Sequence, residues 1–381
     1  MQAKVLLCQN SAFIANRLPR AARALKQAGY DVEILNWDRG INSEVIQMAV
    51  QQFAKEGIKV HTIYCGVTPY GKGILTAFQK LKFAMKVIEF LLKNGNNYQI
   101  VHAIDFDLGF PVFLAKKIKR NLSFKFIYDI ADFVETFHSP IPKIVRNQIT
   151  RVSQLIMKFC DVIIIPDKNR FINIPNELHP KTFVINNTID PPKEIKEYPI
   201  QKSEEKINIL YYGALSKDRG IDLLLQLTSL DNVCIWIAGK GELQEEITLY
   251  AEKHDNVYFL GYLEFPQVLS VVQQIDLIYM VYDPAYQHNQ IASPNKLFEA
   301  LYSGKPCIVA NGTSIDKLVE KENIGYVVEY NETDLKNTVM KLNKKDLMKK
   351  GLNAKALYPQ YSWEKTKKKL IELYQKLHNG D

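Results

Sequence analysis

The chain has 381 residues, of which 47% are hydrophobic and 24% are charged, and its formal net charge is +8. This length exceeds what one ordinary hydrophobic core holds, so two domains are expected in a protein of globular composition. The apolar residues that follow Met1 are too few for a signal peptide, and no apolar run approaches the length of a membrane-spanning helix.

The cysteines are odd in number and widely scattered, and no two have the spacing of metal ligands. We expect reduced thiols and a cytoplasmic protein. The cysteines are Cys8, Cys65, Cys160, Cys234 and Cys307.

Charge is distributed unevenly along the chain. Residues 1–195 contain 26 Lys and Arg against 16 Asp and Glu, a net charge of +10, whereas residues 196–381 contain 23 against 25, a net charge of −2. A basic first half favours an anionic partner, such as a lipid surface or a phosphorylated acceptor.

The first half alternates apolar runs, typical of buried strands, with helical patterns. Expected strands lie at 3–8, 31–37, 98–105, 123–136, 161–166 and the start of 182–190. Expected helices lie at 18–30, at 72–93, within 106–120 after a loop, and in the segment that carries Lys143, Arg146, Arg151 and Lys158. This is a nucleotide-fold pattern, but it lacks the G-x-G-x-x-G loop of NAD-binding proteins.

Residues 191–206, with three prolines and eight charged residues, are interpreted as an interdomain linker. A second α/β pattern follows, in which the expected strands begin at residues 207, 233, 257, 276, 307 and 325. Lysine-rich helical segments come after them, and the last of these is at 361–377.

The most informative stretch is SPNKLFEALYSGKP, residues 293–306. Ser-Pro-Asn predicts the start of a short helix near Pro294, and Gly304 predicts its end. The apolar stripe of this helix is Leu297, Phe298 and Leu301. The helix start and Lys296 together favour an anion, and Glu299 suits the paired hydroxyls of a ribose. Phosphate beside ribose indicates a nucleotide.

With the preceding NQIA, this stretch resembles the donor-sugar motif of the GT-B glycosyltransferases, specifically the retaining family 4 in its SPNKLFEA variant. The alternative is an ordinary turn, helix and strand of a doubly wound domain. The resemblance implies an α/β GT-B fold, with two Rossmann-like doubly wound domains that face a central cleft. The implied acceptor domain is 1–190, with the C-terminal helix 361–381 crossing back onto it, and the nucleotide-sugar domain is 207–360.

The resemblance also implies donor-site residues. The segment from Gly213 to Gly220 resembles the family's phosphate-binding segment, but Ala214 replaces the arginine that often follows the first glycine. The diphosphate charge therefore falls to Arg219 and Lys296, which are the candidate catalytic cations. The other donor-binding candidates are Gly213, Lys217, Tyr262 (near the nucleobase), Ser293, Pro294, Asn295 and Glu299. A second glutamate, eight residues before Glu299 in many members, is Ile291 here, so Asn289 or Gln290 is a candidate contact to the sugar. The turn Gly239-Lys240-Gly241 is explained equally well by backbone geometry.

In the first domain, acidic residues follow the ends of two expected strands, where ligands of open sheets bind. Asp129 and Asp132 lie in a segment similar to the family's Tyr-Asp-Ile-x-Asp, but the family's sugar-binding histidine is Ala131 here. Either aspartate is a candidate substitute in catalysis. His102 and Asp105 are acceptor-binding candidates, although a satisfied histidine at a strand end explains His102 as well.

Arg17 and Arg20 begin the first expected helix and are further acceptor-binding candidates, for an anionic acceptor or for the donor phosphates. The alternative is two solvated arginines. The family's motif before this helix is reduced to Asn16-Arg17, whereas Trp37-Asp38-Arg39 is intact.

No metal or other cofactor is expected. Asp105-Phe106-Asp107 has the spacing of a metal-binding Asp-x-Asp, but it lies in the first domain and the GT-B family needs no metal. We interpret it as structural or acceptor-binding.

The helix expected at 72–93 carries five lysines and one acid, Glu89, between apolar residues at helical spacing. Such a basic amphipathic helix suits a membrane interface. The alternative is a core-packing helix with a solvated lysine face.

These observations predict a glycosyltransferase that moves a sugar from a nucleotide-diphosphate sugar to a lipid-linked or other saccharide acceptor, with retention of configuration. The expected setting is surface polysaccharide synthesis (capsule, lipopolysaccharide or exopolysaccharide) at the inner face of the cell membrane, with no nucleic-acid partner. The alternatives are a GT-B-fold sugar-nucleotide epimerase or hydrolase, and a non-catalytic partner of another transferase, which would need neither Glu299 nor the cations. The sequence does not name the nucleobase, the sugar or the acceptor.

Overall fold

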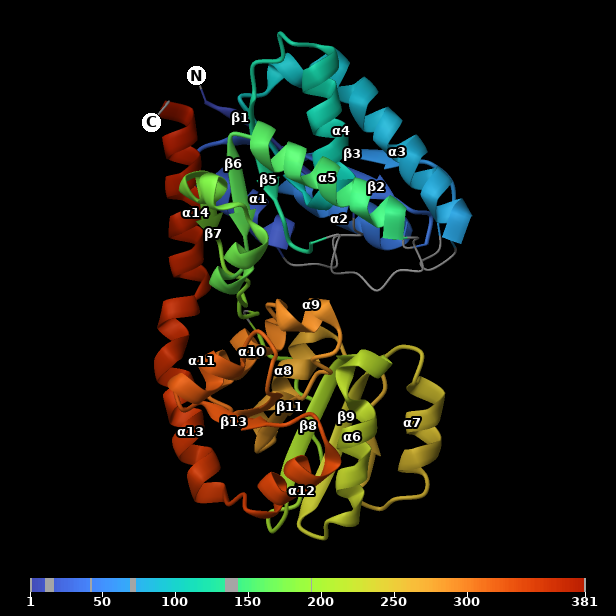
Figure 1. The fold of residues 1–381 in the computed structure, drawn as a ribbon, viewed down its shortest axis with the longest axis vertical. Helices are drawn as coiled ribbons and strands as arrows, with labels where there is room; N and C mark the ends of the chain where they lie inside the picture. The colour runs from blue at the N-terminus through green and yellow to red at the C-terminus, as the bar shows by residue number, and fades with distance from the viewer. Residues whose placement is uncertain are drawn as a thin grey trace. The chain divides into compact units, whose positions relative to one another are not determined.

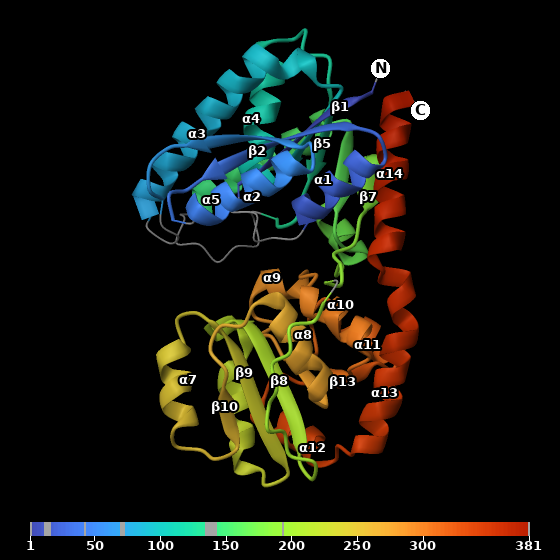
Figure 2. The same cartoon turned by 180° about the vertical axis from the view of Figure 1, so that it is seen from behind.

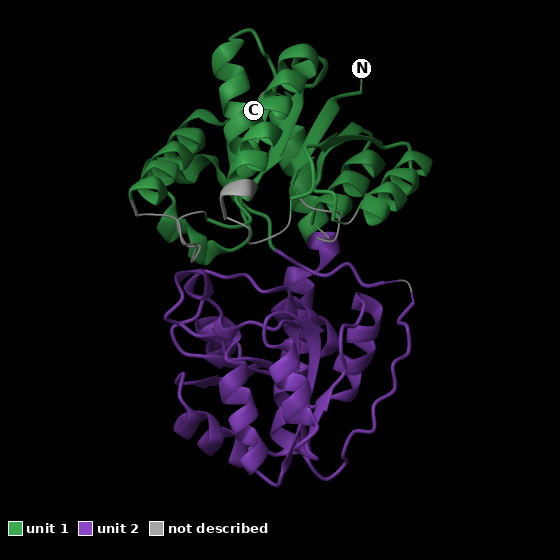
Figure 3. Cartoon of the chain, turned by 90° about the vertical axis from the view of Figure 1, so that its right-hand side faces the viewer, with its two compact units in different colours: residues 1–186, 366–381 green, residues 187–365 purple. Residues whose placement is uncertain are grey.

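The computed structural model describes residues 2–10, 17–41, 43–68, 73–133, 143–192 and 194–379, and its chain divides into two compact units (Figure 3). Unit 1 comprises residues 1–186 and 366–381, and unit 2 comprises residues 187–365. Asn16, Lys72, Lys193 and residues 134–136, which belong to segments interpreted above, lie outside the described residues.

Unit 1 is built on a seven-stranded parallel sheet with the order β3-β2-β1-β4-β5-β6-β7 (Figure 1). Its strands are β1 (Lys4–Gln9), β2 (Asp31–Asp38), β3 (Lys59–Tyr64), β4 (Ile100–Ile104), β5 (Lys125–Asp129), β6 (Val162–Ile165) and β7 (Thr182–Val184). Its helices are α1 (Arg17–Gln27), α2 (Ser43–Lys55), α3 (Gly73–Asn94), α4 (Asp105–Ile118) and α5 (Lys143–Phe159). The strand order reverses between β1 and β4, which is where ligands bind in such sheets.

Two expectations for unit 1 are wrong in detail. The loop expected after β4 is absent, because α4 begins at Asp105 directly after the strand. The strand expected at 123–136 ends at Asp129, although the Ile130 N–H still donates to the Ile164 carbonyl of β6. The chain therefore turns away from the sheet earlier than its apolar run suggests.

Unit 2 repeats the design with a six-stranded parallel sheet of order β10-β9-β8-β11-β12-β13. Its strands are β8 (Ile207–Ala214), β9 (Val233–Lys240), β10 (Val257–Phe259), β11 (Leu277–Met280), β12 (Cys307–Ala310) and β13 (Gly325–Val328). Its helices are α6 (Ile221–Gln226), α7 (Gln244–Ala251), α8 (Phe265–Gln274), α9 (Gln287–Gln290), α10 (Asn295–Ser303), α11 (Asp316–Lys321), α12 (Glu332–Met340) and α13 (Lys344–Leu357). Here the order reverses between β8 and β11. Two doubly wound domains are therefore confirmed.

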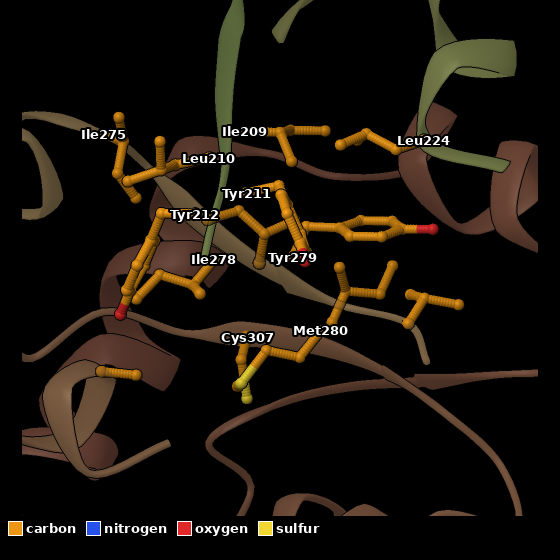
Figure 4. Close-up of a cluster of buried hydrophobic side chains, with 14 of the residues drawn as sticks. Ile209, Leu210, Tyr211, Tyr212, Leu224, Ile275, Ile278, Tyr279, Met280 and Cys307 are labelled. Carbon is orange, nitrogen blue, oxygen red and sulfur yellow. The ribbon is translucent and has the colours of Figure 1, made fainter. Parts of the chain in front are cut away.

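The central strands of unit 2 are apolar on both faces because helices cover both sides of the sheet. Figure 4 shows side chains of β8 and β11, including Leu210, Tyr211 and Tyr279, packed together in this core. Residues of the expected linker belong to the same unit. The backbone N–H of Tyr198 donates to Ser270 of α8, and that of Ile200 donates to Gln274 of the same helix.

The last helix, α14 (Trp363–Asn379), completes the core of unit 1, as Figures 1 and 2 show beside β7. Leu370, Leu373 and Tyr374 are buried against residues of β1, β2 and α1. The Tyr374 ring meets the Tyr30 ring edge-on, with 5.8 Å between centroids. The expectation that the C-terminal helix returns to the first domain is confirmed.

The five cysteines are all buried and unpaired. Across the described residues, no helix has the combined length and apolar character needed to cross a membrane.

Candidate functional site

The candidate donor site lies in unit 2, where β8 and β11 end side by side at the reversal of the strand order. The short 3-10 turn η5 (Lys217–Arg219) follows β8, and α10 begins at Asn295, before β12. The Gly213-to-Gly220 segment and the SPNKLFEA stretch are thus brought together at one edge of the sheet.

Helix α10 has the predicted limits. Pro294 is its extended N-cap residue, and Gly304 ends it in the left-handed conformation, with φ of 64°. The predicted apolar stripe is buried, so the helix is anchored on the sheet. Its first turn therefore holds Lys296 in a fixed place beside the backbone N–H groups of the helix start.

Lys296 lies among three tyrosines. Its Nζ donates a hydrogen bond of 3.0 Å to the Tyr282 hydroxyl and lies 4.0 Å from the centroid of the Tyr211 ring and 5.4 Å from that of Tyr212. A Cβ placed on Gly213 would come within 3.3 Å of the Lys296 side chain, so glycine leaves room for it. Burial, and secondarily the nearby Arg219, lower the pKa of Lys296 to about 7.

Arg219 is held by a carboxylate and by an aromatic ring. Its Nε lies 3.1 Å from Asp218 Oδ2, and its Cζ lies 4.7 Å from the centroid of Tyr282. Ser216 donates to the other oxygen of Asp218, and His288 Nε2 lies 2.9 Å from Oδ2. Burial alone would raise the pKa of Asp218, but these hydrogen bonds and the Arg219 charge hold it below its usual range.

Glu299 is buried one turn after Lys296 on the same helix, and the Tyr212 hydroxyl donates to its Oε2 at 2.5 Å. Burial and this carboxylate raise the pKa of Tyr212 well above its ordinary value. Tyr211 and Tyr212, successive residues of β8, therefore both lie near Lys296, and Tyr212 also contacts Glu299.

The remaining donor candidates surround this centre less closely. Ser293 is buried, its backbone oxygen accepts from Asn187, and its hydroxyl has no hydrogen-bond partner among the described residues. Asn295 and Lys217 are exposed, and Pro294 is half-buried. Asn289 is buried and donates to the backbone of Asp218 and Asp283, and Gln290 donates to the Pro284 backbone, so both amides make structural contacts.

Tyr262 is exposed after β10, and Lys240 Nζ lies 4.5 Å from its ring centroid. The glycines beside Lys240 are explained by close backbone contact. A Cβ on Gly239 would lie 1.9 Å from the Gly213 carbonyl oxygen, and one on Gly241 would lie 2.4 Å from that of Leu215. The geometric interpretation of Gly239-Lys240-Gly241 is therefore sufficient.

Two acceptor candidates, Arg17 and His102, form a closed network with Asp129, a catalytic candidate. Arg17 donates two hydrogen bonds to Asp129, of 2.9 and 2.8 Å, and His102 Nε2 lies 3.1 Å from the same carboxylate. His102 Nδ1 lies 2.6 Å from the Tyr374 hydroxyl. His102 and Asp129 are almost fully buried, so both ring nitrogens of His102 are satisfied inside the fold. Arg20 is half-buried on the next turn of α1.

Asp105 and Asp132 meet at the ends of β4 and β5. Asp105 starts α4 with φ of 60°, unusual for a residue other than glycine, and its Oδ1 accepts from the Asp132 backbone at 3.0 Å. Burial, together with neighbouring Asp132, raises the pKa of Asp105 to about 8. Buried Arg170 donates to the Ala131 carbonyl and lies 3.6 Å from the exposed Asp132 carboxylate.

Asp105 and Asp107 do not act together. Asp107 pairs with Lys80 at 2.8 Å and accepts from Asn10, whereas Asp105 faces Asp132. In the part of the chain that the structure describes, no group of three or more His, Cys, Asp or Glu side chains is arranged to hold a metal ion.

Further residues shape the donor site without belonging to a motif of the sequence, namely Tyr211, Tyr212, Tyr282, Asp218 and His288. The signal for Tyr282 was its place shortly after the apolar run DLIYM, in the segment that leads to the motif. The tyrosines lie in or beside apolar runs, which gives no sign of a role in a site.

Comparisons with known proteins agree with this geometry. Residues 192–357 match the family described as Glycosyl transferases group 1. Sucrose-phosphate synthase from Thermosynechococcus elongatus has a similar structure, with a TM-score of 0.75, 15% identity and full coverage of both chains. Anabaena HepE in complex with UDP-glucose has a TM-score of 0.66 and 16% sequence identity, and the match covers 98% of this chain and 99% of HepE. WaaG, a glycosyltransferase involved in lipopolysaccharide biosynthesis, has a TM-score of 0.66 and 13% sequence identity, and the match covers 97% of this chain and 99% of WaaG.

No curated protein matches the sequence significantly. At these identities the structural likeness establishes the fold, which is the expected GT-B fold. The family match and this fold together support a GT-B glycosyltransferase.

Proposed function

We propose that this chain is a retaining glycosyltransferase of family 4 that moves a sugar from a nucleotide-diphosphate sugar to a lipid-linked saccharide in surface polysaccharide synthesis. The observation that carries the proposal is the pair of cations, Arg219 and Lys296, held around Tyr282 at the carboxyl edge of the second sheet. Glu299 lies one turn after Lys296 on α10, a spacing that suits a ribose contact beside a diphosphate.

The chemistry follows from charge. A nucleoside diphosphate gains negative charge as the sugar departs, so cations fixed beside it stabilise the transition state more than the ground state. Arg219, Lys296 and the N–H groups at the start of α10 supply that stabilisation. We propose that these groups suffice without a divalent metal ion.

The proposed acceptor and pathway come from two proteins of similar structure. HepE binds UDP-glucose, and WaaG acts in lipopolysaccharide biosynthesis, so a sugar nucleotide and a membrane-bound saccharide are the substrates we propose for this chain. The net charge of +10 in residues 1–195 supports a location on the anionic cytoplasmic face of the membrane.

Helix α3 offers the surface for this contact. Phe83, Val87 and Leu91 pack into unit 1, while Leu81 and Met85 are more than half exposed. Phe78 is exposed too, and the surrounding lysines Lys80, Lys82 and Lys86 are exposed on the same helix. An apolar stripe between lysines fits a bilayer interface that carries anionic lipid.

Co-sedimentation with vesicles tests the membrane contact. The protein should bind vesicles that contain phosphatidylglycerol and lose binding as salt rises. Leu81→Glu with Met85→Glu should abolish binding, whereas Met348→Glu with Leu352→Glu, an equally spaced exposed pair on α13, should not. Equal recovery with neutral and anionic vesicles would refute the contact.

Ligand binding and turnover test the transfer itself. A panel of UDP-, GDP- and ADP-linked sugars should yield one that raises the melting temperature, because a tight ligand stabilises the folded state. That donor should then be consumed only when a saccharide acceptor is added. Turnover without acceptor would favour the epimerase or hydrolase, and failure of every nucleotide sugar to bind would refute the proposed function.

A further inference from the structure

We infer that Tyr282 is a positioning residue, which holds the Arg219 and Lys296 side chains where both reach one diphosphate. This inference rests on the proposed function and assigns a role to a residue that the sequence motifs do not include. Tyr282 follows β11 and is 3% exposed, so its ring is fixed in the core of unit 2.

Tyr282 contacts each cation in a different way. Its hydroxyl accepts the hydrogen bond from Lys296 Nζ at 3.0 Å, and its ring faces the Arg219 guanidinium, with Cζ 4.7 Å from the centroid. A tyrosine is suited to both contacts, because it joins a negative ring face to a hydroxyl acceptor. Phenylalanine would keep the ring contact with Arg219 but lose the hydrogen bond from Lys296, and leucine would keep neither.

The backbone around Tyr282 is tied to the turn that carries Arg219. The Asp283 N–H donates to the Asp218 carbonyl at 3.0 Å, and Asn289 donates to the same oxygen. The distance between the Tyr282 ring and η5 is therefore set by hydrogen bonds as well as by packing. Lys296 arrives from the other side, on the anchored helix α10.

The contacts of Tyr282 hold Lys296 and Arg219 in place against the repulsion between their two positive charges. Two like charges placed near one anion repel each other while the anion is absent, and Lys296 has its pKa lowered to about 7 by burial and by Arg219. Other charged or titratable groups that act on Lys296 are Glu299 and Asp218, both of which raise its pKa, and Tyr211 and Tyr212, whose rings lie beneath it. Tyr282 keeps the ammonium in place by a hydrogen bond to a neutral group, which leaves the positive charge for the ligand.

A double-mutant cycle isolates this role. We would measure binding of the tightest nucleotide sugar among UDP-glucose, UDP-N-acetylglucosamine and GDP-mannose in wild type, Tyr282→Phe, Lys296→Ala and the double variant. Tyr282→Phe should weaken binding about tenfold, as for loss of a hydrogen bond to a charged group, and Tyr282→Leu should weaken it further. In the Lys296→Ala background, Tyr282→Phe should change binding less than twofold.

The pH profile gives a second measure that a purely structural role would not move. A nucleotide sugar has no phosphate monoester, so its own charge is constant between pH 6 and 9. Wild-type affinity should fall as pH rises through the pKa of Lys296, and this fall should begin at lower pH in Tyr282→Phe, which loses the acceptor for the ammonium. Tyr326→Phe, which removes another tyrosine hydroxyl of unit 2, should keep the wild-type profile.

The outcomes separate the two proposals. If none of the three nucleotide sugars binds the wild-type protein, the proposed function fails and the role of Tyr282 falls with it. If a donor binds but Tyr282→Phe weakens it equally in both backgrounds, with an unshifted pH profile, the positioning role alone is wrong.

Discussion

The carboxyl edges of the two sheets surround Arg17 and Lys296 in different ways. In unit 1, Arg17 forms two hydrogen bonds to the buried Asp129, and His102 and Tyr374 complete the network. In unit 2, Lys296 forms no ion pair among the described residues and lies instead against tyrosines. The strand orders are alike, so the contrast comes from the side chains at the ends of the strands.

This contrast separates stability from binding. Opposite charges that satisfy each other inside a fold hold its elements together but leave little charge for a ligand. A cation held against tyrosine rings lowers stability, because it is partly removed from water, yet its charge remains for an anion. The network of unit 1 is therefore expected to be mainly structural, and Lys296 of unit 2 mainly functional.

The largest expected effect is on the stability of unit 1. Arg17→Ala leaves the Asp129 carboxylate buried without its main partner, which should lower the free energy of unfolding by about 3–5 kcal/mol. Urea denaturation measures it. Arg23→Ala, which breaks the more exposed pair with Glu56, is the control and should cost about 1 kcal/mol or less. Similar losses in both variants would remove the distinction.

Next in size is the loss of catalysis in Lys296→Ala. Without this charge the departing diphosphate is less stabilised, so kcat should fall by roughly 10²–10³, or about 2–4 kcal/mol, together with donor affinity. Steady-state kinetics measure both constants. Lys350→Ala removes another lysine that lies over a tyrosine ring, that of Tyr326, and should leave kcat unchanged. An unchanged kcat in Lys296→Ala would contradict the assigned role.

Glu299→Ala should act mostly on binding. Ribose hydroxyls change little during the reaction, so the donor KM should rise by the equivalent of about 1.5–3 kcal/mol while kcat changes little. Circular dichroism should first show that the variant is folded, because Glu299 also accepts from Tyr212. If the donor KM stayed the same, Glu299 would be only a structural partner of Tyr212.

A smaller effect is expected in the pH dependence of stability. The pKa of Lys296 is lowered to about 7 in the folded state, below its ordinary 10.5, so the unfolded chain binds more protons between these values. The contribution of Lys296 to stability should therefore rise with pH across this window, by roughly 1–2 kcal/mol after solvent screening. The raised pKa of Asp105 acts in the opposite direction but equally in wild type and in Lys296→Met. Urea titrations at pH 6 and pH 9 should therefore give a change in stability that is more positive in wild type than in Lys296→Met. Equal changes would mean that Lys296 does not contribute.

The smallest expected effect is that of a chelator. If Arg219 and Lys296 supply the charge at the diphosphate, transfer activity should be the same with and without EDTA. Activity lost in EDTA and restored by Mn²⁺ would show that another group stabilises the leaving diphosphate.

Local patterns predicted the elements better than the contacts between them. The limits of α10 followed from Pro294 and Gly304, and β12 followed from its apolar run, because caps and buried strands are local features. The bond between Arg17 and Asp129 joins residues 112 positions apart, and no local pattern reports it. The role of Tyr282 is likewise not visible in the sequence, because a tyrosine after an apolar strand gives no sign of which charges will lie against its ring.

The return of α14 to unit 1 has a consequence for synthesis on the ribosome. Unit 2 is continuous in sequence, so its whole core is available as soon as residue 365 has emerged. Unit 1 lacks Leu370, Leu373 and Tyr374 until about 180 residues after its residue 186 have been translated. At roughly 5–20 residues per second, its first strands wait about 10–40 s with an incomplete core and without the Tyr374 partner of His102 Nδ1. Chaperone dependence during translation should therefore concentrate in the N-terminal half.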